Sequence, residues 1–216
     1  LILKENLNET GDLLNYFFGF APQLSIINFL CAAKSKGRFE IEQSQIVDRE
    51  SIIKRIINSN IIDGLNINHF RPMPSFAPLG INLHPDCLAT VAIAIIDNKP
   101  KPMEDYIDFD KLYLLLAKKK NVKKVTPILG SIYFVMLLLK SVKPKKLFLG
   151  LKMFFGYIFK RGKNSLMIIT VEQFMSEYYQ DVERLKYCTT SFVTENGSMV
   201  PGCVYYHPDK TRNTSG

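Results

Sequence analysis

Hydrophobic residues along this chain fall into blocks with different spacing. Leu88–Ile96 is almost continuously apolar and ends at Asp97-Asn98, which is typical of a buried strand followed by a turn. A short return through Lys99–Met103 is expected after that turn. Earlier in the chain, Asp48 stands in N-cap position before isoleucines at three- and four-residue spacing: Ile52, Ile53, Ile56 and Ile57. The pattern predicts an amphipathic helix there and a buried strand over 88–96.

The region after residue 107 has the leucine spacing of helices. One helix is predicted to begin at Asp108 or Asp110, with three leucines facing inward: Leu112, Leu115 and Leu116. Two more helices are expected near 126–141 and 145–160. The last two of these helices would form an apolar pair, with lysines in and beside the stretch that joins them.

Neither helix of this pair is long enough to cross a bilayer. The apolar runs Pro127–Leu139 and Leu147–Phe159 are thirteen residues each, whereas a spanning helix needs about 20. Two interpretations stay open. The pair packs on the protein core with its lysines in solvent, or it forms an apolar hairpin, rimmed by lysine, that rests on a membrane or admits a lipid chain.

These elements predict an α/β (α+β) protein built from four segments. Their expected contents follow the chain: helix and strand in 1–70, a proline-rich loop and strand with Cys87 in 71–107, a basic apolar helical region in 108–169, and a helix with a cysteine hairpin in 170–216. The helix of the last segment is expected over about Val171–Tyr179, with Thr170 as its N-cap.

Positive charge is concentrated in one part of the chain, whose formal net charge is +8. Fourteen of the 28 Lys and Arg residues lie between Lys111 and Lys163, and this window contains no Asp or Glu. Such asymmetry favours a surface that meets phosphate groups of lipid or nucleic acid. Nucleic acid is not expected, because the lysines alternate with aliphatic residues and no aromatic–basic or zinc-finger motif is present.

The four cysteines do not form a local metal-binding motif. Cys31, Cys87, Cys188 and Cys203 include no C-x-x-C pair, so any metal site must be assembled from distant segments. No signal-peptide pattern is visible at the start of the sequence. Metal or redox use of the thiols is therefore favoured over a disulfide framework.

The last two cysteines lie on the arms of one predicted β-hairpin. Asn196-Gly197 is a strong hairpin signal, because the two-residue turn that it favours requires positive φ at both positions. β-branched and other apolar residues flank it: Phe192, Val193, Met199 and Val200. The hairpin brings the thiols of Cys188 and Cys203 to the same end, which provides half of a four-thiolate site or else a disulfide.

Two segments of the chain match a known arrangement. The first is His84-Pro85-Asp86-Cys87, ahead of the apolar strand. The second begins at Phe174-Met175 and continues through Glu183-Arg184 and Cys188 to the Asn196-Gly197 turn and Pro201-Gly202-Cys203. Over about residues 70–207 they resemble the C-terminal half of radical SAM proteins of the tetraether synthase type. That family has the same elements in the same order, with Gly, Asp and Phe where this chain has Leu88, Asn196 and Gly202.

The resemblance implies a site, a reaction and a setting. Cys87, Cys188 and Cys203 would ligate an auxiliary [4Fe–4S] cluster, and residues 1–70 would be the end of a partial radical SAM barrel. S-adenosylmethionine and a second [4Fe–4S] cluster are expected upstream, because the C-x-x-x-C-x-x-C triplet that holds them is absent from this sequence. In that family a 5′-deoxyadenosyl radical activates a C–H bond of a long apolar lipid chain, and a carbon–carbon bond follows.

The expected partners are therefore a lipid or other long apolar substrate and an anionic membrane surface, with a cytoplasmic location, peripheral on the inner face of the membrane. No catalytic residue is assigned. Cys31 is expected to be a buried structural cysteine, His84 to cap its loop, and Glu183 and Arg184 to form surface pairs. The alternative is a non-enzymatic, peripheral membrane-binding module with a structural zinc or no metal.

Overall fold

The computed structural model of the chain describes most of its residues: 1–21, 23–32, 41–72, 84, 86–96, 98–117, 127–148, 165–175, 181–186, 188, 191–194 and 196–205. The α-helices are α1 (Thr10–Phe18), α2 (Arg49–Asn58), α3 (Phe109–Ala117), α4 (Pro127–Ser141), α6 (Val182–Lys186) and α7 (Gly202–Tyr205). Short 3-10 turns are η1 (Leu7–Glu9), η2 (Gln43–Gln45), η3 (Ile67–His69), η5 (Met103–Asp105) and η6 (Pro144–Lys146).

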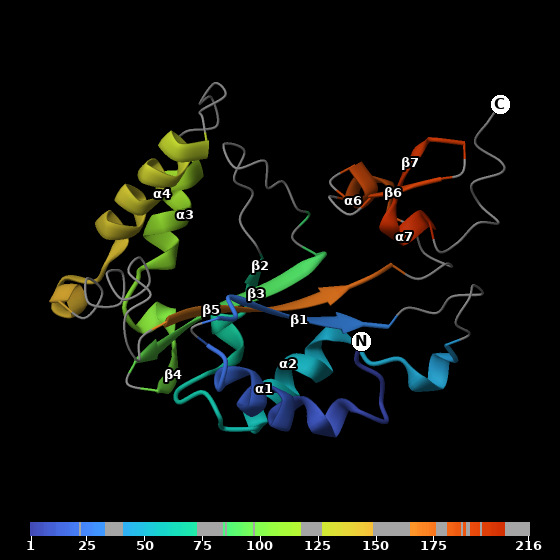
Figure 1. Cartoon of the computed structure of the whole chain (residues 1–216), viewed down its shortest axis with the longest axis horizontal. Helices are drawn as coiled ribbons and strands as arrows, with labels where there is room; N and C mark the ends of the chain where they lie inside the picture. The colour runs from blue at the N-terminus through green and yellow to red at the C-terminus, as the bar shows by residue number, and fades with distance from the viewer. Residues whose placement is uncertain are drawn as a thin grey trace.

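One five-stranded mixed sheet forms the centre of the fold (Figure 1). Its strands are β1 (Ile26–Cys31), β2 (Arg71–Pro72), β3 (Leu88–Ile96), β4 (Lys99–Pro102) and β5 (Ser165–Gln173). β5 lies between β1, to which it is parallel, and β3, to which it is antiparallel. β2 and β4 both pair with β3, at its start and at its end. A separate two-stranded hairpin consists of β6 (Ser191–Val193) and β7 (Met199–Pro201).

Several local predictions are confirmed. The apolar run 88–96 is β3, and the return after Asn98 is β4. Asp48 caps α2, because its carboxylate oxygen Oδ1 accepts a hydrogen bond of 2.6 Å from the Ser51 N–H. The helix predicted near 126–141 is α4, and the one predicted from Asp108 or Asp110 is α3, with Leu112 buried. Most of the helix expected over 145–160 lies outside the described residues.

The helix predicted over Val171–Tyr179 is wrong in its first turn. Thr170 and Val171 belong to β5, and residues 176–180 lie outside the described part of the chain. Thr170 caps no helix; its hydroxyl donates to Asn28 Oδ1 on β1 at 2.8 Å. The β-branched residues around position 170 favour a strand, and pairing with β1 and β3 satisfies their backbone.

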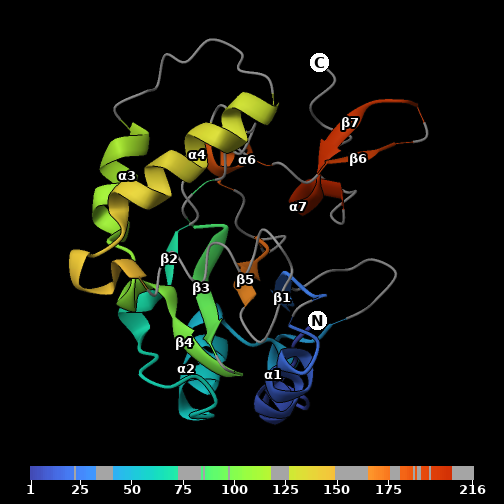
Figure 2. The same cartoon turned by 60° about the vertical axis from the view of Figure 1, so that its left-hand side comes forward.

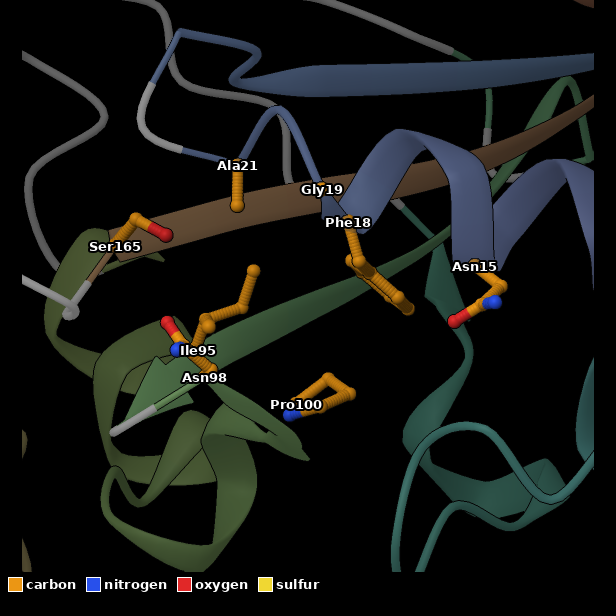
Figure 3. A pocket seen from close by; sticks show the side chains of 8 residues that line it. All are labelled: Asn15, Phe18, Gly19, Ala21, Ile95, Asn98, Pro100 and Ser165. Atoms are coloured by element: carbon orange, nitrogen blue, oxygen red, sulfur yellow. The ribbon is translucent and has the colours of Figure 1, made fainter.

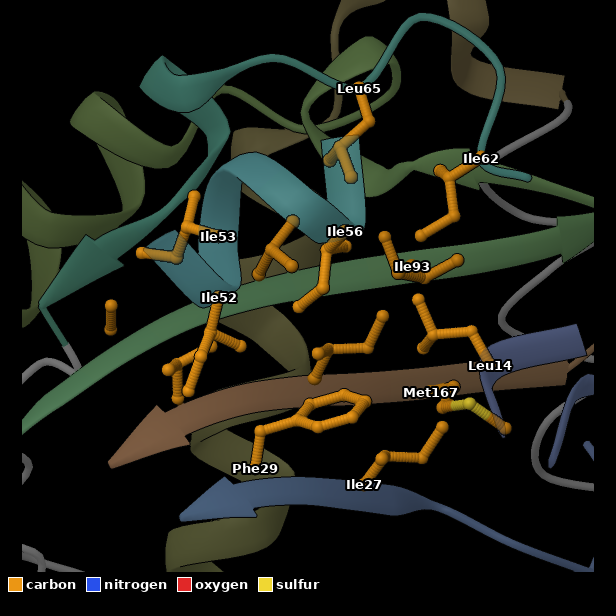
Figure 4. Close-up of a cluster of buried hydrophobic side chains, with 14 of the residues drawn as sticks. Leu14, Ile27, Phe29, Ile52, Ile53, Ile56, Ile62, Leu65, Ile93 and Met167 are labelled. Atoms are coloured by element: carbon orange, nitrogen blue, oxygen red, sulfur yellow. The ribbon is translucent and has the colours of Figure 1, made fainter. Parts of the chain in front are cut away.

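The face of the sheet toward α1 and α2 holds the main hydrophobic core (Figure 4). Alternate residues of the three long strands point into it, and the fully buried ones include Ile93, Met167, Ile169 and Val171. Leu14 of α1 and Ile52 and Ile56 of α2 cover them from the helical side. Period-two burial on the strands and the isoleucine stripe on α2 meet in one core.

α3 and α4 lie on the other side of the sheet (Figures 1 and 2). A smaller cluster of Ala94, Met103, Tyr106 and Ile107 anchors them, with Leu138 and Leu166 packed against it. Within the described residues, no helix has both the length and the apolar character that crossing a bilayer requires.

The fold is thus mixed α/β with helices on both faces of a mixed sheet, as the α/β (α+β) prediction requires. In the described part of the chain this sheet is open rather than closed into a barrel. The sheet takes β1 from segment 1–70 and β3 and β4 from segment 71–107, and β5 crosses the boundary between segments 108–169 and 170–216. All four predicted segments therefore contribute to one sheet.

Candidate cysteine site

The strands β1 and β5 finish at the same end of the sheet, and β3 begins at that end. Leu88, the first residue of β3, pairs with Glu172 near the end of β5. The Gln173 N–H donates to the carbonyl oxygen of Cys87 at 3.1 Å. Cys87 therefore lies at this end of the sheet, held by the backbone of β5.

His84 helps to shape the loop that leads into Cys87. Its Nδ1 accepts a hydrogen bond of 3.3 Å from the Asp86 N–H, and its carbonyl oxygen accepts one of 3.0 Å from the Cys87 N–H. The geometry is that of the loop cap expected for this histidine.

Arg184 on α6 connects Cys87 to the end of β5. Its Nε donates to Cys87 Sγ at 3.0 Å, and its Nη2 donates to the carbonyl oxygen of Gln173. Asp181 fixes the start of α6, since its Oδ1 accepts from the N–H groups of Glu183 and Arg184 at 2.9 and 3.2 Å. The helix α6 and the end of β5 thereby hold the Arg184 guanidinium in contact with the Cys87 thiol.

The prediction that Glu183 and Arg184 make surface pairs holds for Glu183 alone. Glu183 forms an exposed pair with Lys186 at 2.5 Å, whereas Arg184 is part of the cysteine site. No local pattern in the sequence indicates the contact between Arg184 and Cys87, because the two residues are 97 positions apart along the chain.

Cys203 lies in the first turn of α7 and is 8% exposed. Burial raises the pKa of its thiol, a backbone hydrogen bond with Met175 and the charge of Arg184 lower it, and the thiols of Cys188 and Cys87 raise it further. Cys188 follows α6, with its N–H bonded to the Leu185 carbonyl at 3.1 Å. The three predicted thiols therefore share one electrostatic environment around Arg184.

The hairpin that joins Cys188 to Cys203 differs slightly from the predicted one. The Thr194 carbonyl accepts from the Gly197 N–H at 2.9 Å, and the Thr194 N–H donates to the Ser198 carbonyl at 2.9 Å. These bonds make the loop one residue longer than a two-residue Asn196-Gly197 turn. Gly197 has φ of +80°, as predicted, but Asn196 is not among the described residues with positive φ, so the prediction for that position is wrong.

All four cysteines are free thiols. Among the described residues, no three Cys, His, Asp or Glu side chains stand in a ready-made arrangement that could hold a metal ion. In the described part of the chain the three thiols therefore do not form a preformed ligand set. Their donor chemistry suits an iron–sulfur cluster or zinc, since both take thiolate ligands, and Arg184 supplies a positive charge beside them.

Cys31 belongs to a different environment. It is the last residue of β1 and is 0% exposed within the main core. Besides burial, the charges that act on the pKa of its thiol are those of Arg49, Asp48 and Glu172, and none is another thiol. It matches the buried structural cysteine that its apolar neighbours predict.

Burial raises the pKa of the Cys31 thiol from 9.0 to about 12. Below pH 9 the thiol is protonated in both folded and unfolded chains. Between pH 9 and 12 only the unfolded chain loses the proton, so the free energy of unfolding should fall by up to about 1.4 kcal/mol per pH unit. Urea titrations at several pH values from 9 upward, on the wild type and Cys31→Ala, measure this difference in slope. Parallel curves for the two proteins would contradict it.

A second polar cluster joins the edge of the sheet to α3. Arg71 lies between Glu104 and Asp110, with N···O distances of 2.6 Å to each. His69 Nε2 is 3.6 Å from the second oxygen of Glu104, and pairs with it when protonated. His69 therefore has a structural role beside Glu104, which the sequence around it does not predict.

A pocket of about 390 Å³ lies at the opposite end of the sheet (Figure 3). Its lining comes from the end of α1, the β3–β4 turn and the start of β5: Asn15, Phe18, Gly19, Ala21, Ile95, Asn98, Pro100 and Ser165. None of these residues is a His, Cys, Asp, Glu, Lys or Tyr, so the pocket provides no acid–base pair.

No protein-family model matches this chain, and a search of curated proteins found no match.

Proposed function

We propose that this chain is the C-terminal auxiliary iron–sulfur and lipid-substrate part of a radical SAM enzyme that resembles tetraether synthase. One observation carries the proposal: Arg184 Nε donates to Cys87 Sγ at 3.0 Å, and the charge of Arg184 and the thiols of Cys188 and Cys87 all act on the pKa of the buried Cys203 thiol. Thiols from separate segments beside one cation are donors that suit an iron–sulfur cluster.

The residues present fit a cluster in their chemistry. Three thiolates bring negative charge into a partly buried place, and the Arg184 guanidinium offsets it through its contact with Cys87 Sγ. The protein does not need a preformed ligand set, because metal binding supplies free energy that draws nearby ligands together. A fourth ligand is expected from upstream, since Cys31 is confined to the core.

Each element has a role in this proposal. The end of β5 and α6 position Cys87 and Arg184, and the β6–β7 hairpin with α7 positions Cys203. The auxiliary cluster would store or pass electrons for a reaction on a long apolar chain. S-adenosylmethionine cleavage belongs to the upstream part, which would carry the C-x-x-x-C-x-x-C triplet.

Anaerobic reconstitution of the full chain with iron and sulfide tests the proposal. Iron and acid-labile sulfide should co-purify with the protein, together with the broad visible absorption of a thiolate-bound cluster. A parallel sample receives zinc alone. Binding of zinc with no retention of iron and sulfide would favour the structural-zinc alternative, and a protein that retains neither would refute the cluster.

A further inference from the structure

The chain between the end of α4 and residue 148 carries exposed lysines next to exposed apolar side chains. We define the lysine corner as residues 140–148. Its lysines are all exposed: Lys140, Lys143, Lys145 and Lys146. Leu147 is 48% exposed and Phe148 is 84% exposed. An aromatic side chain that stays in water contributes little to the stability of the fold. Its position beside several cations therefore favours a binding surface.

The lysine corner is held firmly on the body of the protein. The Ser141 carbonyl accepts from the Asp108 N–H at 2.8 Å, and the Lys143 N–H donates to the Tyr106 carbonyl at 2.9 Å. Lys143 Nζ also donates to the Glu104 carbonyl at 2.6 Å, and Lys146 Nζ lies 5.9 Å from the centre of the Tyr106 ring. The corner is therefore a preformed surface, so docking through it loses little conformational entropy.

Its charge is not neutralised locally. The whole window from Lys111 to Lys163 contains fourteen basic residues and no acidic ones. Among the described residues, Lys140 and Lys145 form no ion pair, and the carboxylates of Glu104 and Asp110 are paired with Arg71. Asp108 also lies next to the corner, through its N–H bond to the Ser141 carbonyl. Lys140 and Lys145 are therefore available to an external anion.

We infer that the lysine corner docks the protein onto an anionic lipid bilayer, with Phe148 and Leu147 entering the interfacial region and the lysines meeting lipid phosphates. Nucleic acid fits less well, because the corner offers the single ring of Phe148 rather than a row of stacking rings, and the other exposed apolar side chains near its lysines, Met136 and Leu139, are not aromatic. The inference does not depend on the cysteine site.

Vesicle co-sedimentation of the full chain tests the inference, with phosphatidylcholine vesicles that contain or lack phosphatidylglycerol. Binding should require the anionic lipid and weaken as salt is raised. Each lysine at an anionic surface gives about a fivefold gain in partitioning. Lys140→Gln with Lys145→Gln, which removes the two lysines without structural contacts, should therefore weaken binding about 25-fold.

A matched double variant provides the control. Lys4→Gln with Lys54→Gln removes the same charge from two exposed positions, Lys4 ahead of η1 and Lys54 on α2, where it pairs with Glu50. The helix α2 lies on the face of the sheet opposite to α4 (Figure 1). It should reduce binding by less than about fivefold, the effect of one lysine at the surface. Phe148→Ser changes no charge and should weaken binding about tenfold, because the interfacial burial of a phenyl ring is lost.

Three results would overturn the inference. The first is equal binding to vesicles with and without phosphatidylglycerol. The second is an equal loss of binding in the two double variants. The third is tighter binding to duplex DNA than to anionic vesicles at the same salt concentration, which would assign the lysines to nucleic acid. Iron content is measured on the same samples, so failure here is distinguishable from failure of the iron–sulfur proposal.

Discussion

Replacing Cys87, Cys188 or Cys203 singly by alanine should abolish the iron and sulfide that the reconstituted protein retains. Each change removes one thiol of the proposed ligand set. Loss of an outer-shell partner alone lowers metal affinity about 10- to 100-fold, so loss of a ligand should lower bound iron by more than about tenfold. Iron, sulfide and visible absorption are measured per protein after anaerobic reconstitution.

Cys31→Ala is the matched control for this series. It removes the same atom from the same chain, but from the end of β1 in the main core rather than from the cysteine site. The control should keep its iron and sulfide. If all four variants lost the cluster equally, the loss would reflect general destabilisation, and the assignment of three specific ligands would be wrong.

Ile93→Ala should lower the free energy of unfolding by about 2–5 kcal/mol. Ile93 is 0% exposed at the middle of β3, between β5 and the helices of the main core (Figure 4). Truncation removes apolar contacts and leaves a cavity, because the strands on either side are fixed by their backbone pairing. Urea unfolding followed by circular dichroism measures the shift in midpoint.

A graded pair of variants keeps this result interpretable. Ile93→Val should cost about 0.5–1.5 kcal/mol and gives a measurable value even where the alanine variant fails to fold. Ile26→Ala on β1 makes the same truncation at a side chain that is 54% exposed, and should cost less than about 1 kcal/mol. Equal losses at positions 93 and 26 would show that the assigned core is incorrect.

Local patterns in the sequence predict those elements whose side chains repeat with one clear period. The isoleucine stripe behind Asp48 places α2, and the apolar run 88–96 places β3. Both assignments need information from fewer than about a dozen neighbouring residues, which is the range over which helix and strand periodicity acts. The same local reasoning locates the glycine of the hairpin, whereas the candidate ligand set of Cys87, Cys188 and Cys203 is what the resemblance to a known family implies.

β5 shows where this reasoning stops. Thr170 is predicted to cap a helix that begins at Val171, because threonine is a favoured N-cap residue. Their structure is decided by β1 and β3, whose paired residues lie far away along the chain, such as Asn28 and Thr90. Pairing energy between distant strands leaves no local periodic trace, so only the folded chain reveals it.

The sequence by itself therefore determined the identity of the thiols, the basic window and the elements with a regular local period. The tertiary structure alone decided that β5 joins β1 to β3, that Arg184 reaches Cys87, and that Lys140–Phe148 forms a rigid exposed corner. The reason is physical: periodicity records which side of one element is buried, whereas contacts between elements depend on long-range packing that many different sequences satisfy.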